Sequence, residues 1–277
     1  MVALSRAFYV CFHASRTRCA MQELTCMDVD FECTMCGKCC HDLRLPLTMT
    51  EALAWLERGN DVQILCDASP WLEEPPQQNL HAAHRRRRSF AAVSGSLSAR
   101  VVVIFAGAYQ GACPNLLSDM RCGIYERRPL VCRIYPAEVS PFIELTPSQK
   151  ACPPDAWRSG LSPLLRSGKL VDSDITRMVQ LLRDVDASDI SIKQRVCRLL
   201  GVDSAAVWNE GFVVYSPDRV DLVTALHRAI NEPMMPGVQP WHFISDRKMT
   251  VEALLSVGAS STLVTADKNT SFEYLGF

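Results

Sequence analysis

The order of apolar and polar residues along the chain predicts one buried strand in its first half and several helices in its second. Residues 101–105 are all apolar and four of the five are β-branched, which favours a strand. Apolar residues recur at helical spacing in four later segments, of which the last is short: 173–185, 189–200, 217–230 and 250–257. We therefore expect an α+β protein whose C-terminal part is mainly helical.

Two helix starts are indicated by the residues that would cap them. Thr48 and Glu51 form the pattern of a capping box ahead of an apolar-periodic segment, and Gly59 is suited to end that helix. Farther along, Ser216 is expected as an N-cap and Pro217 as the first helical residue. Each pair predicts a helix start independently of the apolar pattern.

The apolar pattern is interrupted between residues 70 and 98, where the chain is rich in proline, glutamine, serine and arginine. Such a composition predicts a long loop. Four consecutive arginines lie within it, with no aromatic residue between them: Arg85, Arg86, Arg87 and Arg88. We interpret this run as a solvated loop rather than as an anion or nucleic-acid contact.

Composition and charge exclude several classes of protein. The 277 residues suggest one or two domains, and 29 Lys+Arg against 30 Asp+Glu give a net charge of −1, so no nucleic-acid partner is expected. The apolar run 101–109 is much shorter than the about 20 residues that span a bilayer, so no membrane association is expected. The N-terminal apolar stretch is too short for a secretory signal. We therefore expect a cytoplasmic location, where thiols stay reduced.

The chain has 13 cysteines, an odd number that cannot all pair as disulfides. A chain of this length also needs no disulfides in order to fold. Five cysteines are scattered, and we interpret them as small packing residues: Cys11, Cys19, Cys26, Cys66 and Cys197. The other eight follow a pattern: Cys33, Cys36, Cys39 and Cys40 in one dense run, then Cys113, Cys122, Cys132 and Cys152.

The spacing of the dense run favours metal ligation. Two residues between cysteines let both thiolates bind one metal, and Gly37 allows the positive φ of a tight turn. Cys39 and Cys40 are adjacent, and neighbouring side chains alternate faces in an extended segment, so they are expected to serve two centres, or one to cap the other's site. The charge of several thiolates needs compensation, for which nearby cations are available: Lys38, Arg121, Arg127, Arg128 and Arg133.

Taken together, the cysteine motifs resemble a known family. F-E-C-T-M-C-G-K-C-C at 31–40, C-G-I-Y-E-R-R-P-L-V-C-R-I-Y-P at 122–136 and A-C-P at 151–153 are similar to the cysteine-cluster family of zinc- or iron-chelating domains, the YkgJ-like proteins. The resemblance implies a bacterial, cytoplasmic module that binds a metal or an iron–sulfur cluster. It implies eight ligands: Cys33, Cys36, Cys39, Cys40, Cys113, Cys122, Cys132 and Cys152. The long insert between Cys40 and Cys113 departs from the compact pattern of the family.

We accordingly expect three regions along the chain. Residues 1–26 form a tail, and residues 27–155 form a small cysteine-rich metal-binding module with few short strands and a loop insert around 66–100. Residues 156–277 form the mainly helical C-terminal region. The expected cofactor is zinc or iron, including iron in an iron–sulfur cluster, and the expected partners are metal ions.

Two classes of function fit this organisation. The first is a metal-binding protein, with the eight cysteines shared between two closely placed centres. The alternative is an iron–sulfur-dependent enzyme for electron transfer or protein-lysine methylation, because the cluster also resembles that of flagellin lysine-methylating enzymes. An open coordination position would favour catalysis and closed four-sulfur sites would favour binding. We place binding first because no substrate-binding motif is recognisable. His41 is a less favoured metal ligand than the cysteines.

Overall fold

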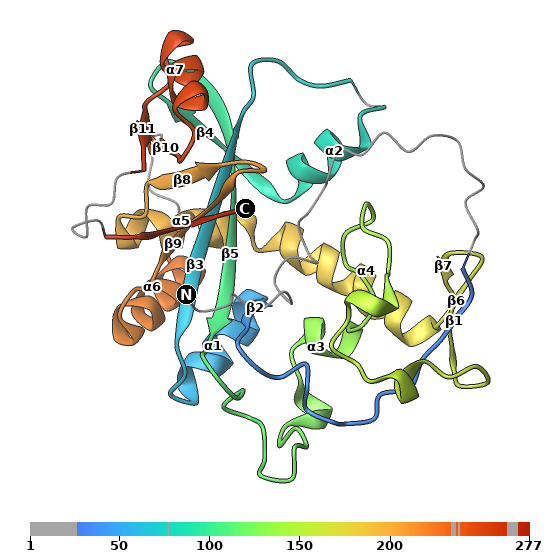
Figure 1. Ribbon diagram of the computed structural model, residues 1–277. Helices are drawn as coiled ribbons and strands as arrows, with labels where there is room; N and C mark the ends of the chain where they lie inside the picture. Colours follow the sequence, from blue (N-terminus) through green and yellow to red (C-terminus); the bar gives the residue numbers. More distant parts are fainter. Residues whose placement is uncertain (1–26, 77, 234–236, 238, 265–270) are drawn as a thin grey trace. The chain divides into compact units, whose positions relative to one another are not determined.

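The computed structural model describes residues 27–76, 78–233, 237, 239–264 and 271–277, and it confirms an α+β protein (Figure 1). By internal contacts the chain forms two units, each made of two segments. Unit 1 is Met1–Leu45 with Ala108–Asp184, and unit 2 is Pro46–Gly107 with Val185–Phe277. These units do not coincide with the expected ranges 27–155 and 156–277, because each joins segments from both. The expected tail, 1–26, lies outside the described residues.

Unit 1 contains a small antiparallel sheet and several turns. The sheet has the order β1 (Val29–Asp30), β6 (Pro163–Arg166), β7 (Lys169–Leu170). Val29, Leu145 and Leu164 are buried together, and Phe31 and Trp157 pack against them. The helical elements are the short α3 (Leu130–Ile134), most of α4 (Ser173–Ser188) and 3₁₀ turns at Tyr125–Arg127, Pro147–Gln149 and Pro154–Trp157. Loops therefore make up most of this unit.

The larger sheet has nine strands among the described residues. β3 and β5 pair antiparallel at the centre of the sheet. On its other edge, β3 pairs first with β9 and farther along with β8. β8, β10 and β11 run parallel to one another. Its strands are β2 (Arg44–Leu47), β3 (Val62–Pro70), β4 (Ser89–Ser94), β5 (Leu97–Ala108), β8 (Ser204–Val207), β9 (Gly211–Tyr215), β10 (His242–Ser245), β11 (Ser261–Leu263) and β12 (Glu273–Gly276).

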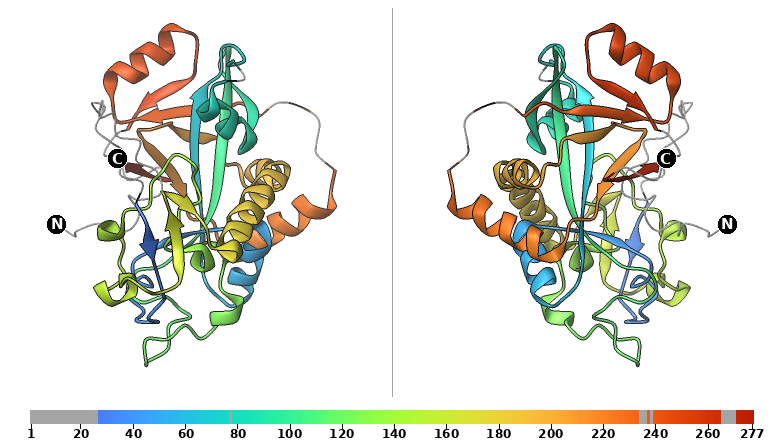
Figure 2. Two further views of the ribbon diagram at one scale, coloured as in Figure 1. Left: turned by 90° about the vertical axis from the view of Figure 1, so that its right-hand side faces the viewer. Right: turned by 90° about the vertical axis from the view of Figure 1, so that its left-hand side faces the viewer.

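Helices of unit 2 cover this sheet. The helices are α1 (Met49–Glu57), α2 (Leu80–Arg87), α5 (Ile190–Leu200), α6 (Arg219–Asn231) and α7 (Lys248–Ser256). α1, α5 and α6 lie on one face of the sheet (Figure 2). α6 contacts both α1 and α5. The apolar periodicity that predicted α5 and α6 is the stripe that each of these two helices buries, with Val196 and Cys197 in α5 and Leu222 and Leu226 in α6.

Helix α1 shows how local sequence fixes one of these elements. The predicted capping box is present: Thr48 Oγ1 accepts from Glu51 N, and the Glu51 carboxylate accepts from Thr48 N. The helix buries Trp55, whose ring lies against β5 at Gly107, where a Cβ would be 2.8 Å from the ring. Only glycine at that position leaves room for the indole.

Three sequence predictions need correction. The segment 70–98 is not one long loop, because it contains the end of β3, helix α2 and strand β4, and β5 begins at Leu97. Helix α6 starts at Arg219 with Asp218 as N-cap, since the Asp218 carboxylate accepts from Val220 N; Ser216 and Pro217 precede it. Strands β8 to β12 interrupt the C-terminal helices, so a mainly helical region is not confirmed. These strands are short and depend on pairing with other strands, β8 and β9 with the distant β3, which local periodicity does not report.

Helix α2 changes the interpretation of the arginine run. Arg85 is buried and pairs with Asp67, Arg86 pairs with Glu74, and Arg88 Nε lies 2.6 Å from Asp186 Oδ2. These three arginines pair with carboxylates of unit 2, and the run lies in α2 and its C-cap, so the expected loop is wrong. The side chains of Arg86 and Arg87 are exposed to solvent, as expected. Because Arg85, Arg86 and Arg88 each have a carboxylate partner, they do not by themselves indicate an anion-binding patch.

The carboxylate of Asp186 is expected to make stability depend on pH. It accepts from Lys193 Nζ at 2.5 Å as well as from Arg88. Although burial raises the pKa of Asp186, the two cations outweigh it and bring the pKa to about 2. An unfolded aspartate has a pKa near 3.9, so Asp186 adds stability above that pH which is lost as pH falls toward 2.

Replacing Asp186 by asparagine should therefore cost about 2 kcal/mol near neutral pH, and the cost should shrink between about pH 4 and pH 2. Urea unfolding at several pH values measures this. Asp174→Asn is the control, because its exposed pair with Arg177 should contribute little. A cost for Asp186→Asn that does not change between pH 6 and pH 2 would contradict the assignment.

Candidate metal centre

All eight cysteines of the pattern lie in unit 1 and are free thiols. Cys33 is exposed and the other seven are partly buried. The dense run from Cys33 to Cys40 connects β1 to β2, Cys132 lies in α3, and the remaining three occupy loops. None of the eight residues is fully buried.

The N-terminal end of the dense run is held next to the segment that follows Cys152. Phe31 N donates to Ser162 O at 2.9 Å, and Glu32 N donates to Ala156 O at 3.0 Å. The Phe31 and Trp157 rings also pack, with centroids 4.8 Å apart. These contacts bring Cys33 and Cys152 into the same neighbourhood although 118 residues separate them in the sequence.

The C-terminal end of the dense run is held next to Cys113. Cys113 N donates to Cys40 O at 2.8 Å, Asp42 N donates to Gly111 O at 2.8 Å, and Gly111 N donates to Asp42 Oδ1 at 2.6 Å. A turn then returns Cys122 toward Cys113, with a bridge between Leu116 and Cys122. Three cysteines from two parts of the chain therefore lie together at this end.

The adjacent Cys39 and Cys40 are close together, with their Sγ atoms 4.0 Å apart. The sequence argument placed them on opposite faces because it assumed an extended segment. The segment is instead a tight turn, in which Cys40 N donates to Gly37 O at 2.9 Å and Gly37 has φ +68°. The turn directs both sulfurs to one side, so the assumption of an extended segment is wrong.

The glycine of this turn is required by its surroundings. A Cβ on Gly37 would lie 2.8 Å from the Met120 carbonyl oxygen, whereas a Cβ on Gly111, which also has positive φ, would meet nothing within 4 Å. Gly111→Ala should cost only the backbone strain, about 1 kcal/mol, and Gly37→Ala should cost about 1–3 kcal/mol more because of the added crowding. Urea unfolding of the metal-free chain measures both, and equal costs would contradict the contact.

Proximity of the thiols changes how readily they ionise. A hydrogen bond from Cys40 lowers the pKa of Cys39 to about 7. The same interaction, with burial, raises the pKa of Cys40. Burial raises the pKa of Cys132, and raises the pKa of Cys152 to about 11 against a hydrogen bond from Tyr135. Cys40, Cys132 and Cys152 thus keep their protons near neutral pH, and a metal ion bound by their thiolates would have to displace them.

The donor set fits a metal that prefers sulfur. Thiolate is a ligand of zinc and of iron. The Cys39 to Cys40 separation of 4.0 Å is close to the about 3.8 Å expected for two thiolates on one tetrahedral zinc with Zn–S bonds of about 2.3 Å. Among the described residues, no three His, Cys, Asp or Glu side chains yet converge on one point. Metal binding would therefore draw loops of this unit together.

One of the five nearby cations is placed to offset the thiolate charge. Arg128 is half-buried, its Nε donates to Tyr125 O at 2.9 Å, and its Cζ lies 3.6 Å from the Tyr125 ring centroid. The charge of Arg128 lowers the pKa of Cys132, although burial has the larger, opposite effect. The same charge lowers the pKa of Cys39, in the same direction as the hydrogen bond from Cys40. The side chains of the other four are exposed: Lys38, Arg121, Arg127 and Arg133.

Two residues near the thiols have roles that the sequence did not indicate. The Tyr135 hydroxyl accepts from Ala151 N at 2.9 Å and interacts with the Cys152 thiol, and Tyr109 interacts with the Cys113 thiol. No spacing pattern in the sequence indicates that a tyrosine will lie beside a cysteine in the fold. His41 Nδ1 lies 3.2 Å from Gly37 O, a contact in which the ring N–H must donate, so only its Nε2 remains for ligation.

The scattered cysteines lie elsewhere. Cys66 and Cys197 are fully buried in unit 2, as expected of packing residues. Cys11, Cys19 and Cys26 lie outside the described residues.

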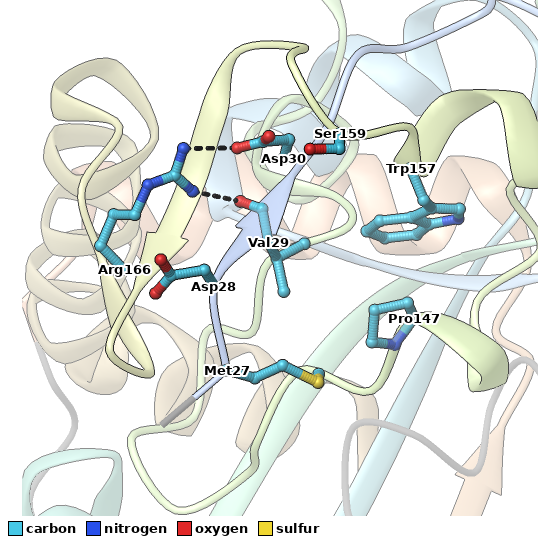
Figure 3. A pocket seen from close by; sticks show the side chains of 8 residues that line it. All are labelled: Met27, Asp28, Val29, Asp30, Pro147, Trp157, Ser159 and Arg166. Carbon is cyan, nitrogen blue, oxygen red and sulfur yellow. Dashed lines mark hydrogen bonds and ion pairs between the residues drawn. The ribbon is translucent and has the colours of Figure 1, made fainter. Parts of the chain in front are cut away.

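A separate pocket of about 490 Å³ lies beside β1 in unit 1 (Figure 3). Arg166 and Asp30 face each other at its edge, and Arg166 also donates to Val29 O at 3.3 Å. Asp30 Oδ2 accepts from Gly160 N, and Asp28 Oδ1 accepts from Ser167 N. These polar groups hold β1 against β6 and the residues that flank β6, and no cysteine is among the described residues that line the pocket.

The loops and free thiols of unit 1 thus define a cysteine-rich module. Residues 32–153, somewhat less than half of the chain, match the family described as "CxxCxxCC: Putative zinc- or iron-chelating domain", so this part of the chain is similar to that family. The match confirms the resemblance drawn from the motifs and supports zinc or iron as the bound element. No curated protein and no solved structure matches the chain.

Proposed function

We propose that this protein binds zinc or iron through the thiolates of unit 1 and that its function is metal binding. The proposed ligands are Cys33, Cys36, Cys39, Cys40, Cys113, Cys122, Cys132 and Cys152. The observation that most supports the proposal is the placement of all eight free thiols in one loop-rich unit, within the stretch that matches a zinc- or iron-chelating family.

The number of donors favours binding over catalysis. Eight thiolates suffice for two four-coordinate centres, and a catalytic centre normally keeps one position open for water or substrate. A catalytic cluster that binds a substrate would need at least one of these cysteines not to be a ligand, whereas an electron-transfer cluster can be closed by four thiolates and is distinguished by its iron, sulfide and visible spectrum. We also propose a cytoplasmic location, because the ligands must remain reduced. Among the described residues, every helix is too short or too polar to cross a bilayer.

Anaerobic purification of the full chain, followed by elemental analysis and a visible spectrum, tests the proposal. We expect zinc or iron to co-purify in a fixed ratio to the chain. A colourless zinc protein would exclude a cluster, and a brown protein containing iron and inorganic sulfide would establish one. Absence of both elements, before and after reconstitution of the reduced chain with either metal, would overturn the proposed function.

A further inference from the structure

A second pocket, of about 460 Å³, lies in unit 2 beside the paired strands β4 and β5. Its volume is within the range of pockets that hold small organic molecules. The lining comes from the segment that follows β3 and from both strands, and most of it is apolar: Trp71, Leu72, Ala91, Ala92, Val93 and Ala99. All of these residues belong to unit 2, so the pocket is separate from the cysteines of unit 1.

The pairing of β4 with β5 explains the floor of this pocket. Ala91 lies opposite Arg100, and Val93 lies opposite Ser98. Residues directly opposite each other in a sheet share a face, so these four side chains point to the same side. Ala91 is exposed and both it and Ser98 are small, which leaves room on this face.

Trp71 forms a wall of the pocket. Its backbone N donates to Ser98 O at 2.8 Å, and its indole Nε1 donates to Glu74 Oε2 at 3.1 Å. The Arg100 Cζ lies 5.6 Å from the centroid of a Trp71 ring. The pocket therefore places an aromatic ring beside a guanidinium group.

Arg100 is bonded only to uncharged acceptors. Its Nε donates to Ser89 Oγ at 2.8 Å, and its Nη2 donates to Arg86 O at 3.0 Å and to Ser89 O at 2.5 Å. Within the part of the chain that the structure describes, its Nη1 has no hydrogen-bond acceptor and its charge has no carboxylate in ion-pair contact. The nearby arginines of α2 and its C-cap differ, because three of them pair with carboxylates.

The surroundings of Arg100 disfavour an uncompensated positive charge. Burial and the charges of Arg86 and Arg85 lower the pKa of Arg100, and the charge of Glu74 offsets only part of this effect. Arginine nevertheless stays protonated in proteins. An anion in the pocket would therefore stabilise this charge.

The two glutamates that line the pocket do not supply that anion. Glu74 Oε1 already pairs with Arg86 Nη1 at 2.6 Å, and Glu74 Oε2 accepts from Trp71. Glu73 is exposed, so water screens its charge. Two neighbouring carboxylates would nevertheless repel a doubly charged phosphate more than a singly charged group.

We propose that this pocket binds a small aromatic carboxylate. The carboxylate accepts from Arg100 Nη1 in a charge-assisted hydrogen bond. The aromatic ring lies against Trp71, Ala91 and Val93. Because no cysteine takes part, the proposal is independent of metal binding by unit 1.

Calorimetric titration of the full chain with phenylacetate and with phenylacetamide tests the proposal, because the two probes share a shape and differ in charge. Phenylacetate should bind, and phenylacetamide should bind at least about tenfold more weakly, since it lacks the charge-assisted bond. Absence of phenylacetate binding, or equal affinity for the two probes, would overturn the proposal.

Variants locate the site. Arg100→Met should remove the preference for phenylacetate, whereas Arg228→Met, the same substitution on the exposed face of α6, should keep it. A folded Arg100→Met chain that still prefers phenylacetate would refute the role of the guanidinium.

Ala91→Trp tests the pocket without removing any bond of Arg100. An exposed strand position accepts an aromatic residue, so the chain should fold, and the added indole should fill the pocket. We expect this variant to lose phenylacetate binding and the control Ala253→Trp, on an exposed position of α7, to retain it. Unchanged binding by Ala91→Trp would show that the carboxylate binds elsewhere.

Discussion

Replacing Cys132 by serine is expected to release metal from unit 1 and to lower its stability. Cys132 lies in α3, and its thiol is within electrostatic reach of Cys39, Cys113 and Cys122. A serine hydroxyl is nearly isosteric but is a poor ligand for zinc or iron at neutral pH. Loss of a direct ligand should weaken binding by more than the roughly 100-fold that loss of an outer hydrogen-bond partner can cost.

The loss of stability follows from linkage. A metal bound by the folded unit adds to its free energy of unfolding, about 4 kcal/mol when free metal is 1,000 times the dissociation constant. We therefore expect the Cys132→Ser chain to unfold at lower urea than the unmodified chain when metal is present. The difference should shrink when both are measured with a strong chelator. Cys36→Ser, in the dense run, should behave in the same way.

Cys197→Ser is the matched control, because it makes the same chemical change at a fully buried thiol of unit 2. It should keep its full metal content, whatever it costs unit 2. Elemental analysis of the three purified variants measures the difference. Equal metal content in Cys36→Ser, Cys132→Ser and Cys197→Ser would refute the assignment of the ligands.

Some features of the fold could be predicted because their causes are local. The capping box at Thr48 and Glu51 is formed by residues three apart, so it is visible in the sequence and present in the structure. The apolar stripes of α4, α5 and α6 are local in the same sense, and their predicted bounds agree with the structure to within a few residues. Strands β8 and β10 have four residues each and are defined by pairing with distant strands.

The candidate site divides along the same line. The eight cysteines are picked out by their pattern, and their role as ligands is implied by the family resemblance. The structure places all eight in one unit, and their role as ligands stays a prediction. The direction of each sulfur depends on the turn at Gly37 and on which distant segment holds each end of the dense run. Arg128 and Tyr135 approach the thiols only because the chain folds back. Spacing alone reports neither.

Removing the charge of Arg85 is expected to destabilise unit 2 by about 3–5 kcal/mol. The side chain is 7% exposed and pairs with Asp67, which is 4% exposed. Its Nε also donates to Ser69 Oγ at 2.7 Å, and its Cζ lies 4.9 Å from the centre of a Trp208 ring. Arg85→Met retains most of the packing volume but leaves the Asp67 carboxylate buried without its cation.

Arg86→Met is the control, since it makes the same substitution on the next residue of α2. Arg86 also pairs with a carboxylate, Glu74, but both side chains are more than half exposed. Water screens such a pair, so its loss should cost about 0–1 kcal/mol. Urea unfolding of the two variants thus compares a buried arginine–carboxylate pair with an exposed one.

The double variant Arg85→Met with Asp67→Asn separates the ion pair from packing. If the cost of Arg85→Met comes from the unpaired carboxylate, neutralising Asp67 should recover a large part of it, because a buried amide is cheaper than a buried charge. The double variant should then be more stable than Arg85→Met alone. If both variants are equally unstable, the contacts of Arg85 with Ser69 and Trp208 stabilise α2, and the buried charge does not.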